Sequence, residues 1–205
     1  MSEKPIIFSG PMVRAILDGR KTQTRRIIKP QPWHGTDSYH GDAPECWTEG
    51  HCALCDGYKW TAGDLLWVRE TWSHTGQGVW TIGDARMSFG GKVVYRADED
   101  TPGAGWFPSI HMPKEFARIF LKVTNVRVER LQDISEEDAI AEGIQSTGGG
   151  RYWIADFDAG YTPRSAASMA FMDLWERING ERSREANPWV YALTFERVDR
   201  MSKAA

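Results

Sequence analysis

Short alternating runs of apolar residues dominate the chain, and no regular alternation of strand and long helix separates them. In the longest run, at 116–130, Ile119, Leu121 and Val123 share one face, as expected for a β-strand. Further strands are expected at 21–27, 65–72, 79–82, 92–97 and 189–198. We therefore predict an α+β fold built on a mixed β-barrel of roughly five to six strands, because closure of a barrel removes exposed strand edges.

Three short helices are expected to flank this barrel, each with apolar residues at helical spacing. The first lies between Ser9 and Gly19, and the second lies between Ser135 and Gly143. In both, a serine is suited to cap the helix start and a glycine is suited to the left-handed conformation that ends it. The third helix follows Pro163.

The length of 205 residues suits one domain, which we place at 1–198 and which is followed by a tail at 199–205. Two long insertions are expected to interrupt it. Residues 29–62 are irregular and rich in Cys, His and Pro, and residues 145–162 read as a glycine-rich loop.

Charge and hydropathy exclude two classes of protein. The chain has 25 basic and 28 acidic residues, a net charge of −3, whereas a protein that coats polyanions has a large basic excess. No apolar run approaches the ~20 residues that a membrane-spanning helix needs. The N-terminal residues also lack the apolar core of a signal peptide. We expect a soluble, cytoplasmic protein with no membrane partner.

The chain has 10 tryptophans, which is far above ordinary usage. Five fall inside patterned segments and are expected in the core: Trp67, Trp72, Trp80, Trp175 and Trp189. The other five lie in loop-like sequence: Trp33, Trp47, Trp60, Trp106 and Trp153. A loop tryptophan either packs on the core or offers a platform on which a nucleobase stacks.

Opposite charges gather in two segments. Residues 1–30 hold seven basic and two acidic side chains, and residues 133–142 hold five acidic and no basic ones. The basic cluster can bind an anion such as phosphate. Alternatively, the two segments are partners for each other, and both interpretations are open from the sequence.

Lys21 and Thr24 lie close together after the first predicted helix. A partly desolvated lysine can lose its proton near neutral pH and act as a base, and a neighbouring threonine hydroxyl can be a nucleophile. Strict strand alternation would put the two side chains on opposite faces, so the pair requires a bend just after Gly19.

Three segments together resemble a known family. Residues 19–26 read Gly-Arg-Lys-Thr-Gln-Thr-Arg-Arg, residues 63–70 read Gly-Asp-Leu-Leu-Trp-Val-Arg-Glu, and residues 131–143 form a capped helix after the long strand. This arrangement resembles the ASCH domain, a branch of the PUA-like barrel superfamily. The whole chain is similar to the longer ASCH-type proteins that are common in phages and prophages.

The resemblance implies a function in binding RNA or modified nucleosides. One small bacterial member of the family is an amidohydrolase that removes the acetyl group of N(4)-acetylcytidine. Its proposed catalytic Lys, Thr and Glu correspond to Lys21, Thr24 and Glu142, and Arg26 takes the place of a pocket arginine. We therefore expect hydrolysis of an acyl-amide on a modified pyrimidine, with no cofactor required for catalysis.

Two alternative functions stay open. The first is a non-catalytic module that binds single-stranded RNA or a nucleobase, with Arg25 and Arg26 on phosphate and tryptophans stacking on bases. The second is a ribonuclease of prophage origin.

The strand at 65–72 adds three candidate binding residues: Arg69, Glu70 and Trp72. Arg69 and Glu70 have opposite parity, so only one of them can face a pocket. If Glu70 faces the interior, its carboxylate needs a cationic partner, and Arg26 or Lys21 is the expected one. A purely structural ion pair is the alternative.

Three cysteines, Cys46, Cys52 and Cys55, lie within ten residues and have histidines nearby. Together with a fourth ligand they could hold a structural zinc ion, which would order a segment that lacks a core of its own. The alternative is three reduced thiols in a loop.

Overall fold

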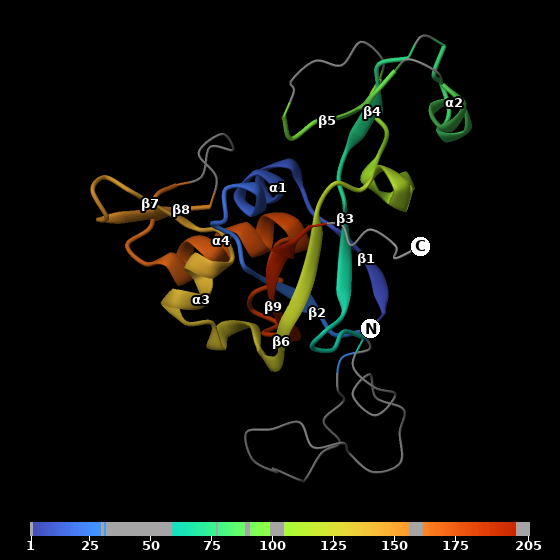
Figure 1. Ribbon diagram of the computed structural model, residues 1–205. Helices are drawn as coiled ribbons and strands as arrows, with labels where there is room; N and C mark the ends of the chain where they lie inside the picture. Colours follow the sequence, from blue (N-terminus) through green and yellow to red (C-terminus); the bar gives the residue numbers. More distant parts are fainter. Residues whose placement is uncertain are drawn as a thin grey trace. The chain divides into compact units, whose positions relative to one another are not determined.

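The computed structural model describes residues 2–29, 31, 59–76, 78–88, 91–98, 105–155 and 162–199 (Figure 1). The chain divides into two compact units, which we describe separately. The first unit comprises Met1–Gly19, Gly63–Lys122 and Glu196–Ala205, and the second comprises Arg20–Ala62 and Val123–Phe195.

Five strands form the main sheet: β1 (Glu3–Ile7), β2 (Gln23–Ile27), β3 (Leu65–Arg69), β6 (Phe120–Arg130) and β9 (Trp189–Val198). Their hydrogen-bonded order is β1-β3-β6-β9-β2. β1 is parallel to β3, whereas β3–β6 and β2–β9 are antiparallel. The α+β class is therefore confirmed. The closed barrel is not, because β1 and β2 stand at the two ends of this order in the described residues.

The first unit begins with β1 and α1 (Gly10–Leu17), the helix expected between Ser9 and Gly19. Gly19 has a φ of +73°, the left-handed conformation that ends a helix with little strain. A second small sheet pairs β4 (Trp72–His74) with β5 (Val93–Tyr95). Two 3-10 helices follow, η1 (Ser109–His111) and η2 (Lys114–Phe116). The core of this unit gathers Leu65, Trp67, Trp72, Met112 and Phe120.

Two expectations fail between β4 and β5. A strand was expected at 79–82, but helix α2 (Ile82–Met87) begins there. Thr81 and Asp84 form a reciprocal capping box, in which each side chain accepts from the other residue's backbone N–H, and this local bonding favours a helix. Trp80 was expected in the core and is 83% exposed, because it precedes the helix rather than lying in a paired strand.

The second unit packs helices against β2 and β9. After β6 come η3 (Leu131–Asp133), α3 (Glu136–Ala141) and α4 (Ala167–Asn179). Ser135 caps α3 by accepting from the backbone N–H of Asp138, as expected, and Gly143 follows with a φ of +103°. The core of this unit includes Leu131, Ile134, Ala139, Phe171, Trp175 and Val190.

The glycine-rich segment at 145–162 contains more regular structure than a loop. β7 (Gln145–Thr147) pairs with β8 (Tyr152–Ile154) in a hairpin. The turn between them holds Gly148, Gly149 and Gly150, which all have positive φ values, so a glycine run suits this turn. Trp153 and Ala155 pack against the core of the second unit and so attach the hairpin to it.

Candidate functional site

Lys21 and Glu142 meet inside the second unit. Lys21 lies two residues before the start of β2, and Glu142 is the C-terminal cap of α3. The Lys21 Nζ donates to Glu142 Oε2 at 2.6 Å and to the Glu142 backbone oxygen at 2.8 Å. The backbone holds the same two segments together, because the Thr22 N–H donates to the Ala141 oxygen at 2.8 Å. The lysine and glutamate side chains are 0% and 3% exposed.

Burial lowers the pKa of Lys21, because removal from water disfavours the ammonium by more than Glu142 stabilises it. The positive charges of Arg26 and Arg25 lower this pKa further. Lys21 therefore gives up its proton more readily than an exposed lysine, which is the property that a general base needs.

Arg25 is the centre of a buried ion-pair network that adjoins Lys21. Its Nη2 lies 2.5 Å from Glu129 Oε1 and 2.7 Å from Asp138 Oδ2. Its Nη1 donates to Gln23 Oε1 at 2.7 Å and to Glu142 Oε1 at 3.3 Å. The side chain is 0% exposed. Arg25 therefore does not present its guanidinium to a phosphate in this structure, contrary to expectation, because carboxylates already surround it.

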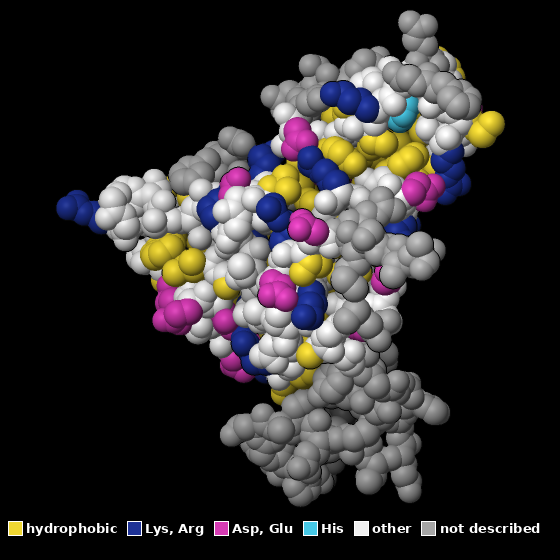
Figure 2. Space-filling view, viewed as in Figure 1, with side chains coloured by type: hydrophobic (Ala, Val, Ile, Leu, Met, Phe, Trp, Pro, Cys, Tyr) yellow, Lys and Arg dark blue, Asp and Glu magenta, His cyan; other side chains and the backbone are white. Residues whose placement is uncertain are grey.

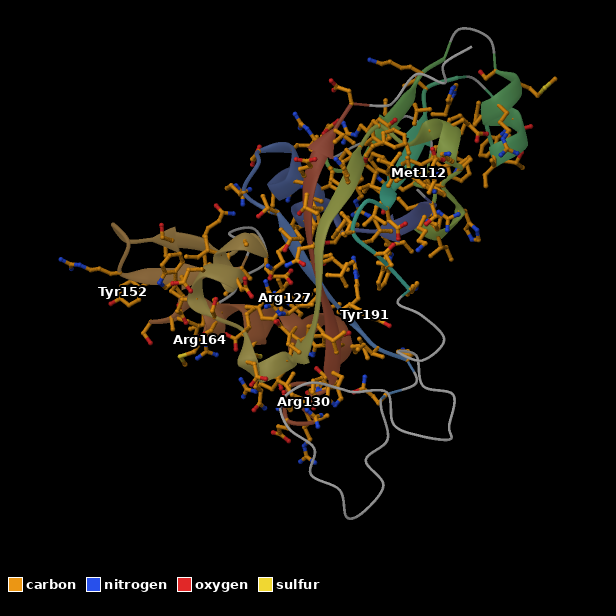
Figure 3. All side chains as sticks on the ribbon, turned by 60° about the horizontal axis from the view of Figure 1, so that its bottom comes forward. Met112, Arg127, Arg130, Tyr152, Arg164 and Tyr191 are labelled. Carbon is orange, nitrogen blue, oxygen red and sulfur yellow. The ribbon has the colours of Figure 1, made fainter. Side chains whose placement is uncertain are left out.

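These contacts decide between the two interpretations of the opposite charges. Lys21 and Arg25 from the basic segment pair with Asp138 and Glu142 from the acidic one. Arg127 of β6, labelled in Figure 3, joins the same network through Glu129 and Asp138. On the face drawn in Figure 2, Lys and Arg side chains likewise lie beside Asp and Glu side chains. For Lys21 and Arg25 the acidic segment is therefore the partner, whereas Lys4 of the same basic segment pairs with Asp64.

Thr24 and Arg26 occupy the alternate positions of β2. Thr24 pairs with Leu193 of β9 and is 3% exposed. The Phe195 N–H donates to the Thr22 oxygen at 2.9 Å, so the pairing with β9 continues to the residue before β2. Among the described residues the Thr24 hydroxyl forms no hydrogen bond with Lys21 or Glu142. The structure thus joins Lys21 to Glu142 through hydrogen bonds in which Thr24 takes no part.

Arg26 lies two residues after Thr24 on β2 and pairs with Tyr191 of β9. Burial lowers the pKa of Arg26, and the negative charge of Glu142 partly opposes this effect. The Arg26 guanidinium and the Glu142 carboxylate therefore interact electrostatically. Arg26 is thereby near enough to influence the Lys21–Glu142 pair.

Glu70 lies in the first unit, and its partner is not one of the expected cations. Arg118 makes two hydrogen bonds to the Glu70 carboxylate, both at 2.9 Å. The Arg118 guanidinium also bonds to Asp98 and lies 3.9 Å from the centre of the Tyr95 ring. The expected partners of Glu70, Arg26 or Lys21, are therefore wrong, because Arg118 of the same unit binds both oxygens of the carboxylate. Burial raises the pKa of Glu70 even though Arg118 opposes the shift.

Arg69 and Trp72, expected as binding residues, have partners within the same unit. The Arg69 Nε donates to the backbone oxygen of Met112 at 3.1 Å, and its guanidinium lies 4.9 Å from the Trp67 ring centre. Trp72 is fully buried and stacks on Phe107 with ring centres 4.6 Å apart. Trp72 is therefore a core residue and offers no surface on which a base could stack.

Sequence reasoning missed several residues of these networks, among them Glu129, Asp138 as a partner of Arg25, and Arg118. The acidic first turn of α3 pointed to Asp138 only as a favourable charge at a helix start. Glu129 and Arg118 lie in or beside the long β6 strand, where no local pattern marks an ion-pair partner.

The cysteine cluster Cys46, Cys52 and Cys55 lies outside the described residues. Within the described part of the chain, no group of three or more His, Cys, Asp and Glu side chains is arranged to hold a metal ion. No helix in that same part combines the length and apolar character needed to cross a bilayer.

No family model matches the sequence, and no curated protein matches it significantly. Among solved structures, the chain is similar to an ASCH domain from Lactobacillus crispatus JV V101, with 13% identity, a TM-score of 0.43, and coverage of 97% of this chain and 81% of that chain. It is also similar to protein EF3133 from Enterococcus faecalis V583, of the family DUF984, with 12% identity, a TM-score of 0.40, and coverage of 100% and 86%. The first is an ASCH domain, the family that the motif at 19–26 resembles. At these identities and TM-scores neither structure transfers an activity or a residue role.

Proposed function

We propose that this protein acts on RNA or a modified nucleoside and hydrolyses an acyl-amide on a modified pyrimidine such as N(4)-acetylcytidine. The observation that carries the proposal is the buried Lys21–Glu142 pair, in which Nζ and Oε2 are 2.6 Å apart. Burial of the ammonium lowers the pKa of Lys21 and prepares it to accept a proton from a nucleophile. The resemblance of 19–26 and 131–143 to the ASCH domain supports the substrate class.

In the proposed reaction, the Thr24 hydroxyl attacks the acyl carbon while its proton passes to Lys21. Glu142 orients Lys21, and Arg26 or backbone N–H groups stabilise the oxyanion that forms on the carbonyl oxygen. Collapse of the intermediate breaks the carbon–nitrogen bond, and Lys21 returns the proton to the leaving amine. Water then hydrolyses the acyl-threonine and releases the free acid. Proton transfer requires the Thr24 hydroxyl to come within hydrogen-bond distance of Lys21 Nζ.

A second candidate is a module that binds RNA or a nucleobase without turnover. The burial of Lys21, Thr24 and Glu142, which are 2%, 3% and 5% exposed, favours it, because an ion pair closed to solvent can serve the fold alone. For turnover, the second unit must admit substrate to this network. The two candidates therefore differ in whether the pair is ever reached by a ligand.

The test is to incubate the purified protein with N(4)-acetylcytidine and to follow the release of cytidine by chromatography. Turnover by the wild type is expected, and Lys21→Met and Glu142→Gln are each expected to lower kcat by about 10²- to 10⁴-fold, the usual contribution of general acid–base catalysis. Thr24→Ala should abolish turnover if Thr24 is the nucleophile. Turnover that survives Thr24→Ala but not Lys21→Met would assign the attack to a water molecule.

Lys4→Met is the matched control, because Lys4 also forms a carboxylate ion pair at 2.7 Å, with Asp64, but lies in the first unit. It should retain full turnover. Thermal unfolding of each variant separates loss of activity from loss of fold. No turnover by a folded wild type, together with retention of single-stranded RNA that weakens steeply with salt, would instead establish the binding module.

A further inference from the structure

The two oxygens of the Glu142 carboxylate contact different cations. Oε2 accepts from Lys21 Nζ at 2.6 Å, and Oε1 accepts from Arg25 Nη1 at 3.3 Å. The side chains of Lys21 and Arg25 are both 0% exposed, and that of Glu142 is 3% exposed. A carboxylate held at both oxygens has little freedom to rotate, so the position of Arg25 determines which oxygen faces Lys21.

Arg25 is itself held in place by contacts that do not involve Lys21. Glu129 of β6 and Asp138 of α3 bind its Nη2, and Gln23 of β2 binds its Nη1. The guanidinium is planar and rigid, so anchoring one side of its fork fixes the direction of the other. Three elements of the second unit thus fix the donor that reaches Glu142.

Strand geometry explains why Arg25 is in reach. Lys21, Gln23 and Arg25 have the same parity, and alternation turns side chains of one parity toward one face of the strand. On that face they meet Asp138 and Glu142 of the α3 segment. The contact with Glu142 is therefore a consequence of the register of β2 against α3.

We propose that Arg25 is a positioning residue, which fixes the Glu142 carboxylate so that Oε2 faces Lys21 Nζ. In its catalytic consequence this inference rests on the proposed amide hydrolysis. The charged groups around Lys21 and Glu142 are Arg25 and Arg26 of β2, and the network behind Arg25 consists of Glu129, Arg127 and Asp138. Arg25 acts on the reaction through Glu142 and touches no substrate.

The experiment compares Arg25→Met with Arg127→Met. Both arginines bind Glu129 and Asp138, but within the described residues only Arg25 contacts Glu142. In Arg25→Met, Glu142 is no longer held against Lys21. Because Glu142 raises the pKa of Lys21 by more than the charge of Arg25 lowers it, the titration of Lys21, followed by NMR of isotopically labelled lysine, should move to lower pH. The rising limb of the pH–rate profile should move with it. The kcat should fall by about 10²-fold, the cost of a misplaced catalytic group, with little change in KM.

Arg127→Met should leave the Lys21 titration and the pH–rate profile where they are in the wild type. If Arg25→Met folds and neither the titration nor the rate profile moves, Arg25 has no positioning role. An equal shift in both variants would also overturn the proposal, because it would reflect the network as a whole rather than the contact with Glu142.

If Arg25→Met does not fold, the more conservative variant Arg25→Lys tests the proposal instead. It retains the charge but lacks the fork that binds two partners at once, so Glu142 is again no longer fixed, and the Lys21 titration should move to lower pH while kcat falls. A crystal structure of Arg25→Lys in which Glu142 still bonds to Lys21 in the same orientation would overturn the proposal. If the wild type shows no turnover, the proposed function fails, whereas the titration and the crystal structure still decide the role of Arg25.

Discussion

Lys21 Nζ and Glu142 Oε2 lie 2.6 Å apart, although 121 positions separate the two residues in the sequence. The pair connects the segment before β2 to the C-terminal cap of α3, and both side chains are closed to solvent. A buried pair of this kind is costly to form and costly to break, because the partner left behind keeps its charge without water. The consequences can be measured in stability as well as in activity.

Lys21→Met should change how the stability of the protein depends on pH. In the folded protein the pKa of Lys21 lies below its ordinary value of 10.5. Between the lowered pKa and 10.5 the unfolded chain binds more protons at this position than the folded chain, so the contribution of Lys21 to stability rises with pH. Urea unfolding at a series of pH values measures this effect. The free energy of unfolding of the wild type should increase relative to that of Lys21→Met as the pH approaches 10.5. A constant difference across that range would contradict the prediction.

Arg25→Met should destabilise the fold by about 3–5 kcal/mol, because it removes a buried cation shared by three carboxylates and leaves Glu129 and Asp138 with only the partly exposed Arg127. Arg127→Met should cost no more than ~1 kcal/mol, since its side chain is 39% exposed and water screens its ion pairs. Chemical denaturation of the two variants measures both values. Equal losses would show that the burial of Arg25 does not matter.

Glu70→Gln should reveal a pH dependence of opposite sign in the first unit. Burial raises the pKa of Glu70 above its ordinary value of 4.5, so the folded protein binds the proton more tightly than the unfolded chain. The resulting contribution to stability is complete below pH 4.5 and is lost as pH rises through the raised pKa. Wild type should therefore lose stability relative to Glu70→Gln from pH 4.5 upward, as measured by urea unfolding.

Glu196→Gln is the control for this measurement. The Glu196 side chain is 55% exposed and forms an ion pair with Lys122 at 3.7 Å. Its replacement by glutamine therefore removes a solvent-exposed carboxylate from the same unit. If Glu196→Gln reproduces the pH dependence seen with Glu70→Gln, burial of Glu70 is not its cause.

Trp72 and Trp80 should respond very differently to truncation. Trp72 is fully buried and stacks on Phe107, so Trp72→Ala should cost about 3–5 kcal/mol. Trp80 is 83% exposed, and Trp80→Ala should change stability by no more than ~0.5 kcal/mol. Denaturant unfolding gives both numbers. A large loss for Trp80→Ala would mean that this side chain is covered by contacts in solution.

The cysteine cluster should be tested by metal analysis. We propose that purified protein carries about one equivalent of zinc, bound through Cys46, Cys52 and Cys55 as thiolates. Replacement of any one cysteine by serine should lower the zinc content, whereas Lys4→Met should not. Wild-type protein free of metal after purification in zinc-containing medium would favour reduced thiols without a metal.

Local sequence determined much of the secondary structure. The capped helix after Ser135 and the last strand at 189–198 appear where they were expected, because capping, glycine conformation and alternating hydrophobicity act within a few residues. The motif at 19–26 likewise singled out Lys21 as a residue with possible chemistry. The strand expected at 79–82 failed for a local reason too, since the capping box of Thr81 outweighed an alternation only a few residues long.

Only the tertiary structure decided which charges meet. Arg25 binds Glu129 and Glu142, which lie 104 and 117 positions away, and Glu70 binds Arg118 instead of Lys21 or Arg26. Charge type and strand parity predict that a buried charged side chain needs a partner of opposite charge. The sequence does not indicate which of the many oppositely charged residues that partner is. The choice among them depends on the order of the strands and on the register of β2 against α3, which arise from packing of segments distant in the chain.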